Sequence, residues 1–299
     1  MVYKTLADIC RISSERKMDF WEVVREDNCR EFQISPEDSF EKMRSMYRAM
    51  RLADETYDGS RRSRSGIIGG DGARMEKAVA GRANFSGDFI GAVMERALKM
   101  GETNACMGRI VAAPTAGSCG VLPAVLITCE KEKGFSEDEI VEALFTAAGI
   151  GQIIAQNASI AGASGGCQAE IGTASAIAAG ALVQLRHGSA EEICMAAAIA
   201  IKGLMGLTCD PVAGLVEVPC VKRNVIGAVN AVTSSDMVMA GIRSAIPADE
   251  VISAMGEIGR EMPSCYRETG KGGLAVTPTA GRIREGIRTK KTSDTENVR

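Results

Sequence analysis

The long apolar stretch from residue 143 to residue 185 limits the possible folds more than any other feature of the sequence. Its length suggests a membrane span, but polar side chains interrupt it. Polar groups are costly in the hydrocarbon of a bilayer, so the stretch predicts buried helices inside a globular protein. The interrupting residues are Gln152, Gln156, Asn157, Gln168 and Glu170.

Helix signals recur on both sides of this stretch, whereas the alternating patterns typical of strands are scarce. Proline at position 36, followed by two acidic residues, fits a helix start. Residues 136–139 and 189–192 have the spacing of a capping box. A further helix is predicted over Phe89–Met100, ending at Gly101. The sequence therefore predicts an all-α, bundle-like chain with its functional residues on Gly- and Pro-rich loops.

The 299 residues suffice for one large domain or two modest ones. We predict a helical N-terminal segment over residues 1–60, a main domain over 61–285 and a polar tail over 286–299. The net charge of -3 gives no strong attraction to nucleic acid or to a membrane surface. No signal peptide is evident at the start of the chain, so a cytoplasmic protein without disulfides is expected.

Cysteines mark the loops on which chemistry is expected. Cys209 and Cys220 enclose a segment with two prolines, which argue against a continuous helix and favour a bent loop. Cys167 lies in a second, glycine-rich loop, GASGGCQAE. Three cysteines on two irregular loops among apolar helices are candidate ligands of a metal centre.

The spacing of these cysteines distinguishes between metals. Structural zinc sites favour Cys pairs separated by two residues, and no such pair occurs in the sequence. Thiolates also suit iron–sulfur clusters, in which three cysteines leave one iron open to a substrate. The alternative is that the three are free cysteines buried in the core.

Two further loops have the composition of anion sites. The segment SRRSRSGIIGGDGARM, residues 60–75, is either a solvated linker or an anion-binding loop built on glycine amides and arginines. The segment PTAGSCG, residues 114–120, leads into a helix, and its amides and hydroxyl groups could bind a carboxylate. The tetrapeptide PTAG recurs at residues 278–281.

Five motifs together resemble the alpha chain of iron–sulfur L-serine dehydratase, and the resemblance extends to about residue 281. They are GGDGARM, APTAGSCGVLPAVL, NASIAGASGGCQAEIGTASA, CDPVAGLVEVPC and YRETGKGGLAVTPTA. The resemblance implies a [4Fe-4S] cluster held by Cys167, Cys209 and Cys220. It also implies that residues 61–285 form the catalytic domain, and that L-serine is converted to pyruvate and ammonia without pyridoxal phosphate.

In this reaction the open iron binds the serine hydroxyl, a base removes the α-proton, and donors stabilise the developing negative charge. Lys271 and Ser118 are the predicted catalytic residues. The predicted substrate-binding residues are Thr115, Gly117, Ser65, Gly69 and Gly70. The base is not identified, because the single histidine, His187, lies at a predicted helix C-terminus, where a structural role is expected.

Some members of the family carry a Ser/His-rich motif in an additional domain, and this sequence has none. A hetero-oligomer with a separate beta chain is therefore expected. Cys119 and Cys265 are further residues that could approach the cluster. Three alternatives stay open: an L-cysteine desulfidase, a threonine-acting relative, and a cluster-binding subunit without chemistry of its own.

Overall fold

The computed structural model of the protein describes residues 3–296, with side chains described up to residue 289. This part of the chain forms thirteen α-helices and no strand, so the predicted all-α fold is confirmed. In chain order the helices are α1 (Leu6–Arg16), α2 (Phe20–Phe32), α3 (Pro36–Glu55), α4 (Asp71–Ala80), α5 (Gly87–Ala105), α6 (Val121–Thr128), α7 (Glu137–Asn157), α8 (Gly162–Gly165), α9 (Thr173–Gln184), α10 (Ala190–Lys202), α11 (Cys220–Met239), α12 (Ala248–Glu261) and α13 (Pro278–Glu296).

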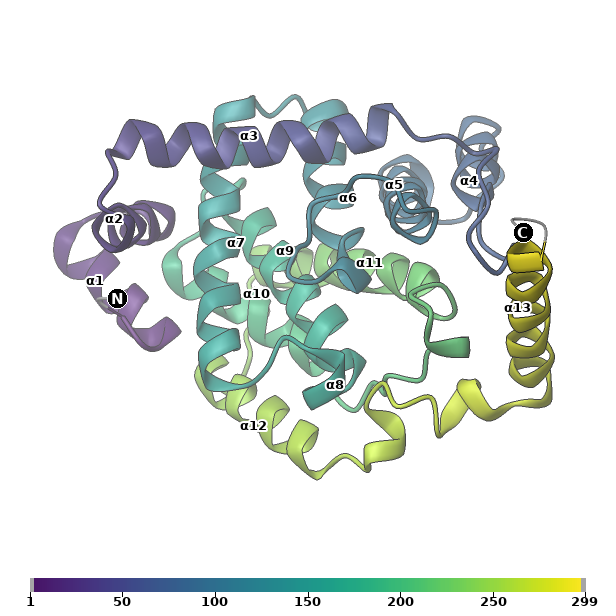
Figure 1. Ribbon diagram of the computed structural model, residues 1–299. Coiled ribbons are helices and arrows are strands. Elements are labelled where there is room, and N and C mark those ends of the chain that lie inside the picture. The colour runs from purple at the N-terminus through teal and green to yellow at the C-terminus, as the bar shows by residue number, and fades with distance from the viewer. Residues whose placement is uncertain (1–2, 297–299) are drawn as a thin grey trace.

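Helix α9 forms the centre of the molecule. All of its residues are buried, and its sequence TASAIAAGALVQ consists largely of small side chains that allow neighbouring helices to approach closely. Helices α6, α7, α10 and α11 surround it (Figure 1). The apolar stretch over residues 143–185 therefore forms buried helices, as predicted. None of the described helices is long and apolar enough to cross a bilayer.

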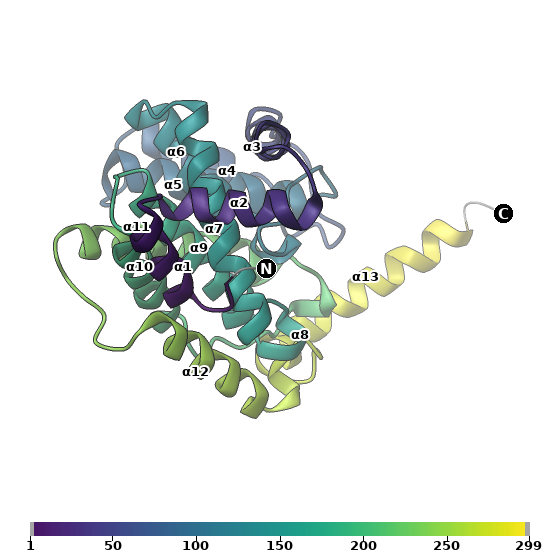
Figure 2. The same cartoon turned by 90° about the vertical axis from the view of Figure 1, so that its left-hand side faces the viewer.

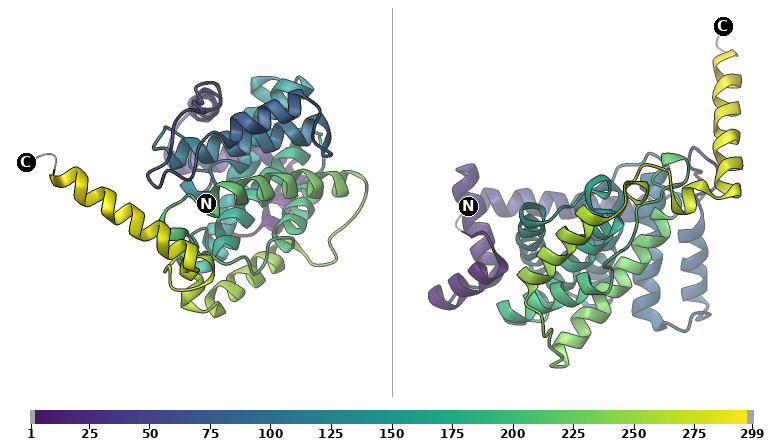
Figure 3. Two further views of the ribbon diagram at one scale, coloured as in Figure 1. Left: turned by 90° about the vertical axis from the view of Figure 1, so that its right-hand side faces the viewer. Right: turned by 90° about the horizontal axis from the view of Figure 1, so that it is seen from below.

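The outer helices pack around this centre. Helix α3 lies across one side of the molecule (Figure 1). Aromatic rings of α2, α3 and α7 pack against one another. Helix α13 extends away from the rest of the protein (Figures 2 and 3). The predicted boundary between residues 60 and 61 falls between α3 and α4, whereas the one between 285 and 286 falls inside α13.

The helix starts predicted from capping signals are confirmed. Ser136 and Ser189 each form a complete capping box, and α7 and α10 begin at the next residue. Proline 36 occupies the first turn of α3. His187 lies just beyond α9 in the left-handed conformation, with a φ of 55°, as expected for a residue after a helix C-terminus.

The prediction that Gly101 ends a helix is wrong, because α5 continues to Ala105. A Cβ atom on Gly101 would lie 3.3 Å from the Cα atom of Val221 at the start of α11. The absence of a side chain at Gly101 therefore allows α5 and α11 to pack closely, and this glycine does not end the helix. A glycine needed for packing and a glycine that ends a helix look alike in a single sequence.

Two glycines of α7 allow this kind of packing to be tested. A Cβ atom on Gly149 would lie 2.4 Å from Cγ2 of Val24, whereas one on Gly151 would lie 3.5 Å from Cγ2 of Ile177. We expect Gly149→Ala to lower the free energy of unfolding by about 1–3 kcal/mol, because α2 must shift.

Gly151→Ala is the matched control, since its methyl group fits and alanine favours the helix by about 0.5–1 kcal/mol. Urea unfolding followed by circular dichroism measures both variants. Equal stability of the two would contradict the packing assigned to Gly149.

Candidate functional site

The three predicted metal ligands lie at the starts of buried helices or on the segment between them. Cys167 directly precedes a single π-helical turn, η3 (Gln168–Gly172), which leads into α9. Cys220 is the first residue of α11. Cys209 lies on the irregular segment before α11. Cys167 and Cys209 are each only 3% exposed to solvent. The site is therefore assembled where the two most central helices begin.

The Cys209 thiol and a carboxylate approach each other at Gly162 of α8. A Cβ atom on this glycine would lie 3.0 Å from Sγ of Cys209 and 2.7 Å from Oε2 of Glu170. The absence of a side chain at Gly162 therefore lets a thiol and a carboxylate approach one point from two different segments. Glu170 belongs to η3, three residues after Cys167, so the π-helical turn places both groups at the site.

Each of the three thiols interacts electrostatically with Glu170. Burial raises the pKa of Cys167 to about 11 and that of Cys220 to about 12. Burial also raises the pKa of Cys209, and the neighbouring Cys167 and Glu170 raise it further. The Arg223 guanidinium acts in the opposite direction on Cys167. Thiolates are therefore disfavoured here unless additional positive charge is supplied.

An ion pair between Arg223 and Asp210, called the latch below, holds the Cys209 segment against α11. Arg223 of α11 donates to the carbonyl of Thr208 at 2.7 Å and to Oδ1 of Asp210 at 2.9 Å. The other oxygen of Asp210 accepts from the backbone amide of Leu274 at 2.9 Å. The latch therefore joins the segment that carries Cys209 to α11 and to the loop before α13.

The same loop pairs directly with Cys209. The amide of Cys209 donates to the carbonyl of Tyr266, and the amide of Glu268 donates to the carbonyl of Cys209, each at 2.8 Å. Lys271 lies on this loop between Glu268 and Leu274, with its side chain exposed. The predicted catalytic lysine therefore lies on the loop that pairs with Cys209, three residues after Glu268. Its catalytic role stays a prediction.

We expect Asp210→Ala to lower the free energy of unfolding by about 3 kcal/mol, because it leaves the half-buried Arg223 without its carboxylate. It also removes the acceptor of the Leu274 amide, so proteolytic cleavage within residues 264–276 should become faster. Glu15→Ala is the control, since Glu15 forms a surface pair with Arg11 that is worth less than about 1 kcal/mol. Thermal unfolding and timed proteolysis measure both effects; similar losses in the two variants would refute the latch.

The loop predicted to bind a carboxylate faces Glu170. Thr115 donates a hydrogen bond from Oγ1 to Oε1 of Glu170 at 2.7 Å, and a Cβ atom on Gly117 would lie 3.1 Å from the same oxygen. Ser118 is fully buried, and with Thr115 it forms the reciprocal cap of the short helix η1 (Ala116–Ser118). The hydroxyl groups of this loop therefore order Thr115 and, through it, Glu170.

The glycine-rich loop before α4 binds an internal carboxylate. Ser63 donates to Glu217 at 2.8 Å, and the hydroxyl of Ser65 donates to the same oxygen. Glu217 lies on the segment between Cys209 and Cys220, so this loop supports the site from outside. Gly69 and Gly70 have φ values of 135° and 84°, a conformation that favours glycine. Their binding of substrate, like that of Ser65, stays a prediction.

The remaining cysteines lie in different surroundings. Cys119 is fully buried, faces the backbone carbonyl of Met100 at 3.8 Å, and burial raises its pKa to about 12. Cys129 and Cys194 are buried in the core, as predicted. Cys265 lies half-buried on the loop that pairs with Cys209. In the described part of the chain, no three His, Cys, Asp or Glu side chains stand close enough together to hold a single metal ion.

The structure adds three charged residues that the sequence interpretation did not assign to the site. Glu170 is named above only as a polar residue that interrupts the apolar stretch, and no role is predicted for Asp210 or Arg223. A signal existed for Glu170, an acidic residue in the most apolar part of the chain, three positions after a predicted ligand. No local signal pairs Arg223 with Asp210, because their contact depends on the path of the Cys209 segment.

Comparison with known proteins gives consistent matches. Residues 15–275 match the family described as serine dehydratase alpha chain. The chain is 41% identical over 286 residues to the probable L-serine dehydratase alpha chain of Bacillus subtilis (strain 168), covering 96% of this chain and 95% of that protein. It is 40% identical over 281 residues to the L-serine dehydratase alpha chain of Peptoniphilus asaccharolyticus, covering 94% and 96%. It is 46% identical over 184 residues to L-serine dehydratase 1 of Escherichia coli (strain K12), covering 60% of this chain and 40% of that protein.

Proposed function

The chain belongs to the serine dehydratase alpha chain family, and from this premise we propose that it is the alpha chain of a two-chain lyase that converts L-serine to pyruvate and ammonia. The observation that carries the proposal is the approach of the Cys209 thiol and the Glu170 carboxylate to each other at Gly162, together with the electrostatic interaction of Cys209 with the other two thiols. The names of relatives that match over nearly their whole length support the two-chain arrangement, because they too are alpha chains.

The residues of the site fit an iron–sulfur cluster. Two buried thiols and one half-buried thiol all interact electrostatically with Glu170, and the pKa values of the three thiols are raised. Positively charged iron would stabilise the thiolates that the protein alone disfavours. The ligands of a polynuclear cluster each bind a different iron atom, so they need not meet at one point as the ligands of a single ion must.

Cys167, Cys209 and Cys220 would hold the [4Fe-4S] cluster in this proposal. A bound cluster supplies Lewis acidity, which makes the β-hydroxyl of serine a better leaving group. Pyridoxal phosphate is not required. The latch between Arg223 and Asp210 holds the segment of Cys209 in position, and the hydrogen bonds between Glu217 and the serines of the glycine-rich loop restrain the same segment from its other side.

Glu170 is the residue that we assign as the base. Its Oε1 accepts a hydrogen bond from Thr115, and in the described part of the chain Oε2 has no hydrogen-bond donor. Oε2 is therefore available to accept the α-proton of serine. Glu170 then returns this proton to the departing hydroxide, so water is released and the carboxylate is regenerated. The aminoacrylate so formed becomes an imine, which water hydrolyses to pyruvate and ammonia. Lys271 is the cation that we assign to the substrate carboxylate.

A coupled pyruvate assay under anaerobic conditions tests the proposal. The purified chain is reconstituted with iron and sulfide and assayed with and without the beta chain, on L-serine, L-threonine and L-cysteine. Pyruvate from serine, dependent on iron and on the second chain, is the expected result. Full activity without a second chain would refute the two-chain arrangement.

The same assay separates the alternatives. A preference for cysteine with release of sulfide would identify a desulfidase, and 2-oxobutanoate from threonine would identify a threonine-acting relative. A protein that takes up iron and sulfide but turns over none of the three substrates, even with its partner, would be a cluster-binding subunit without chemistry of its own.

A further inference from the structure

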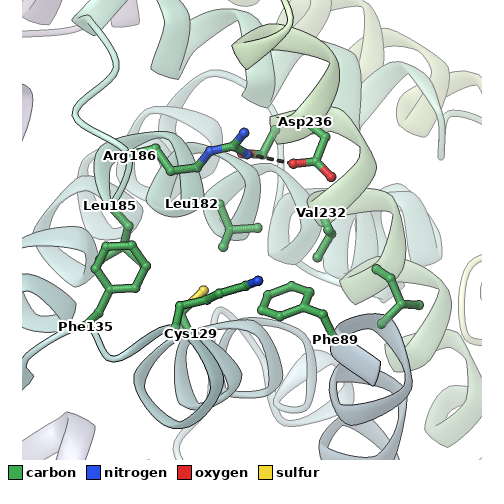
Figure 4. A pocket seen from close by; sticks show the side chains of 11 residues that line it. Phe89, Cys129, Phe135, Leu182, Leu185, Arg186, Val232 and Asp236 are labelled. Atoms are coloured by element: carbon green, nitrogen blue, oxygen red, sulfur yellow. Dashed lines mark hydrogen bonds and ion pairs between the residues drawn. The ribbon is translucent and has the colours of Figure 1, made fainter. Parts of the chain in front are cut away.

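A cavity lies away from the thiol site, between α5, α9 and α11. Its volume is about 520 Å³. Buried side chains of Leu182, Leu185 and Val232 form much of its inner surface, and the rings of Phe89 and Phe135 form its walls (Figure 4). Cavities of roughly 300–1,000 Å³ with mainly apolar linings are typical of small-molecule sites.

Two cations, the exposed Lys133 and the partly exposed Arg186, line this cavity. The positive charges of Lys133 and Arg186 both lower the pKa of the Cys129 thiol, which burial otherwise raises, so both charges lie near this buried residue. Arg186 is paired with Asp236 at 2.7 Å, as Figure 4 shows. Lys133 lies over the ring of Phe89, 5.2 Å from its centroid, and has no carboxylate partner in the described part of the chain. The cavity therefore carries one uncompensated positive charge on an apolar lining.

We propose that this cavity binds a small monocarboxylate with an apolar body, with the carboxylate on Lys133 and the apolar body against the side chains of α9 and α11. A neutral ligand would cover the Lys133 ammonium without offering it a hydrogen-bond acceptor, which is unfavourable. A cationic ligand would be repelled. The charge of the cavity and its lining therefore select an amphipathic anion.

A small molecule fits the cavity better than a protein partner does. A specific protein–protein interface buries roughly 800 Å² on each partner and is generally flat. Here the apolar surface is concave and its inner residues are buried, which favours a ligand that enters the protein. The inference does not depend on the proposed dehydratase reaction, because it concerns a separate cavity and is tested by binding alone.

Titration calorimetry with sodium octanoate on the full chain tests the proposal. We expect saturable binding to one site, and at least about tenfold weaker binding of octylamine, since the charge is reversed. Val232→Trp fills the cavity and should weaken octanoate binding at least about tenfold. Ile226→Trp is the matched control, because Ile226 lies on the same helix, does not line the cavity and is 58% exposed.

The charge is tested by Lys133→Met, with Lys77→Met on α4 as its control. Lys133→Met should weaken the binding of octanoate but not that of octan-1-ol, which has no charge. Circular dichroism establishes that each variant is folded. Equal binding of octanoate and octylamine, no binding of octanoate, or binding unaffected by both Val232→Trp and Lys133→Met would overturn the proposal.

Discussion

The variant Cys209→Ala is expected to lose the iron–sulfur chromophore and more than about 100-fold of the serine dehydratase activity. Even the loss of a residue that only orients a metal ligand costs about 10–100-fold in metal affinity or activity, and a lost ligand should cost more. The segment that carries Cys209 is held in place by Arg223, by Leu274 and by the backbone of Tyr266. Cys167→Ala and Cys220→Ala should give the same result.

Three measurements check this expectation on the two-chain enzyme reconstituted under anaerobic conditions: iron content, acid-labile sulfide, and absorbance near about 400 nm, where thiolate-ligated clusters absorb. Cys194→Ala is the matched control, since Cys194 is also buried and lies in the core on α10. The cluster assignment would be wrong if Cys209→Ala retained iron and sulfide in the same ratio to protein as Cys194→Ala.

The positions of Cys167 and Cys209 outside the long helices were predictable from the sequence because their loops have local signals. Pro211 and Pro219 exclude a helix between Cys209 and Cys220, and glycines surround Cys167. The family resemblance assigns the three cysteines to one cluster, and this assignment stays a prediction. The helical fold was predictable for a related reason: the capping boxes at Ser136 and Ser189 depend only on residues within one turn.

The charged residues around the thiols were not predictable in this way. Asp210 and Arg223 are thirteen residues apart, and they meet only because the Cys209 segment folds back over the start of α11. Gly101 and Gly162 show the same limit. Each is glycine because a distant segment approaches its Cα atom, and that segment cannot be identified from the residues on either side.

Glu170→Gln is expected to lower kcat by about 100- to 10,000-fold, the usual contribution of a general base. The substitution keeps the size of the side chain and an oxygen that can accept from Thr115, but it removes the ability to accept a proton. The cluster should remain, so iron and sulfide contents equal to those of the unaltered enzyme are part of the expected result. A loss of iron together with activity would instead indicate a role in holding the cluster.

The pH dependence of kcat/KM separates a base from a residue that only supports the site. Burial raises the pKa of Glu170, the hydrogen bond from Thr115 lowers it, and the charge of Glu268 raises it. A base must be ionised, so activity falls as the pH drops through this pKa. Thr115→Val should raise the pKa and move the acidic limb of the profile to higher pH, whereas Glu268→Gln should move it to lower pH. The three thiols also lie close to Glu170 and are present in both variants, so they do not account for shifts of opposite sign. Shifts in the same direction, or an unchanged acidic limb in both variants, would exclude Glu170 as the base.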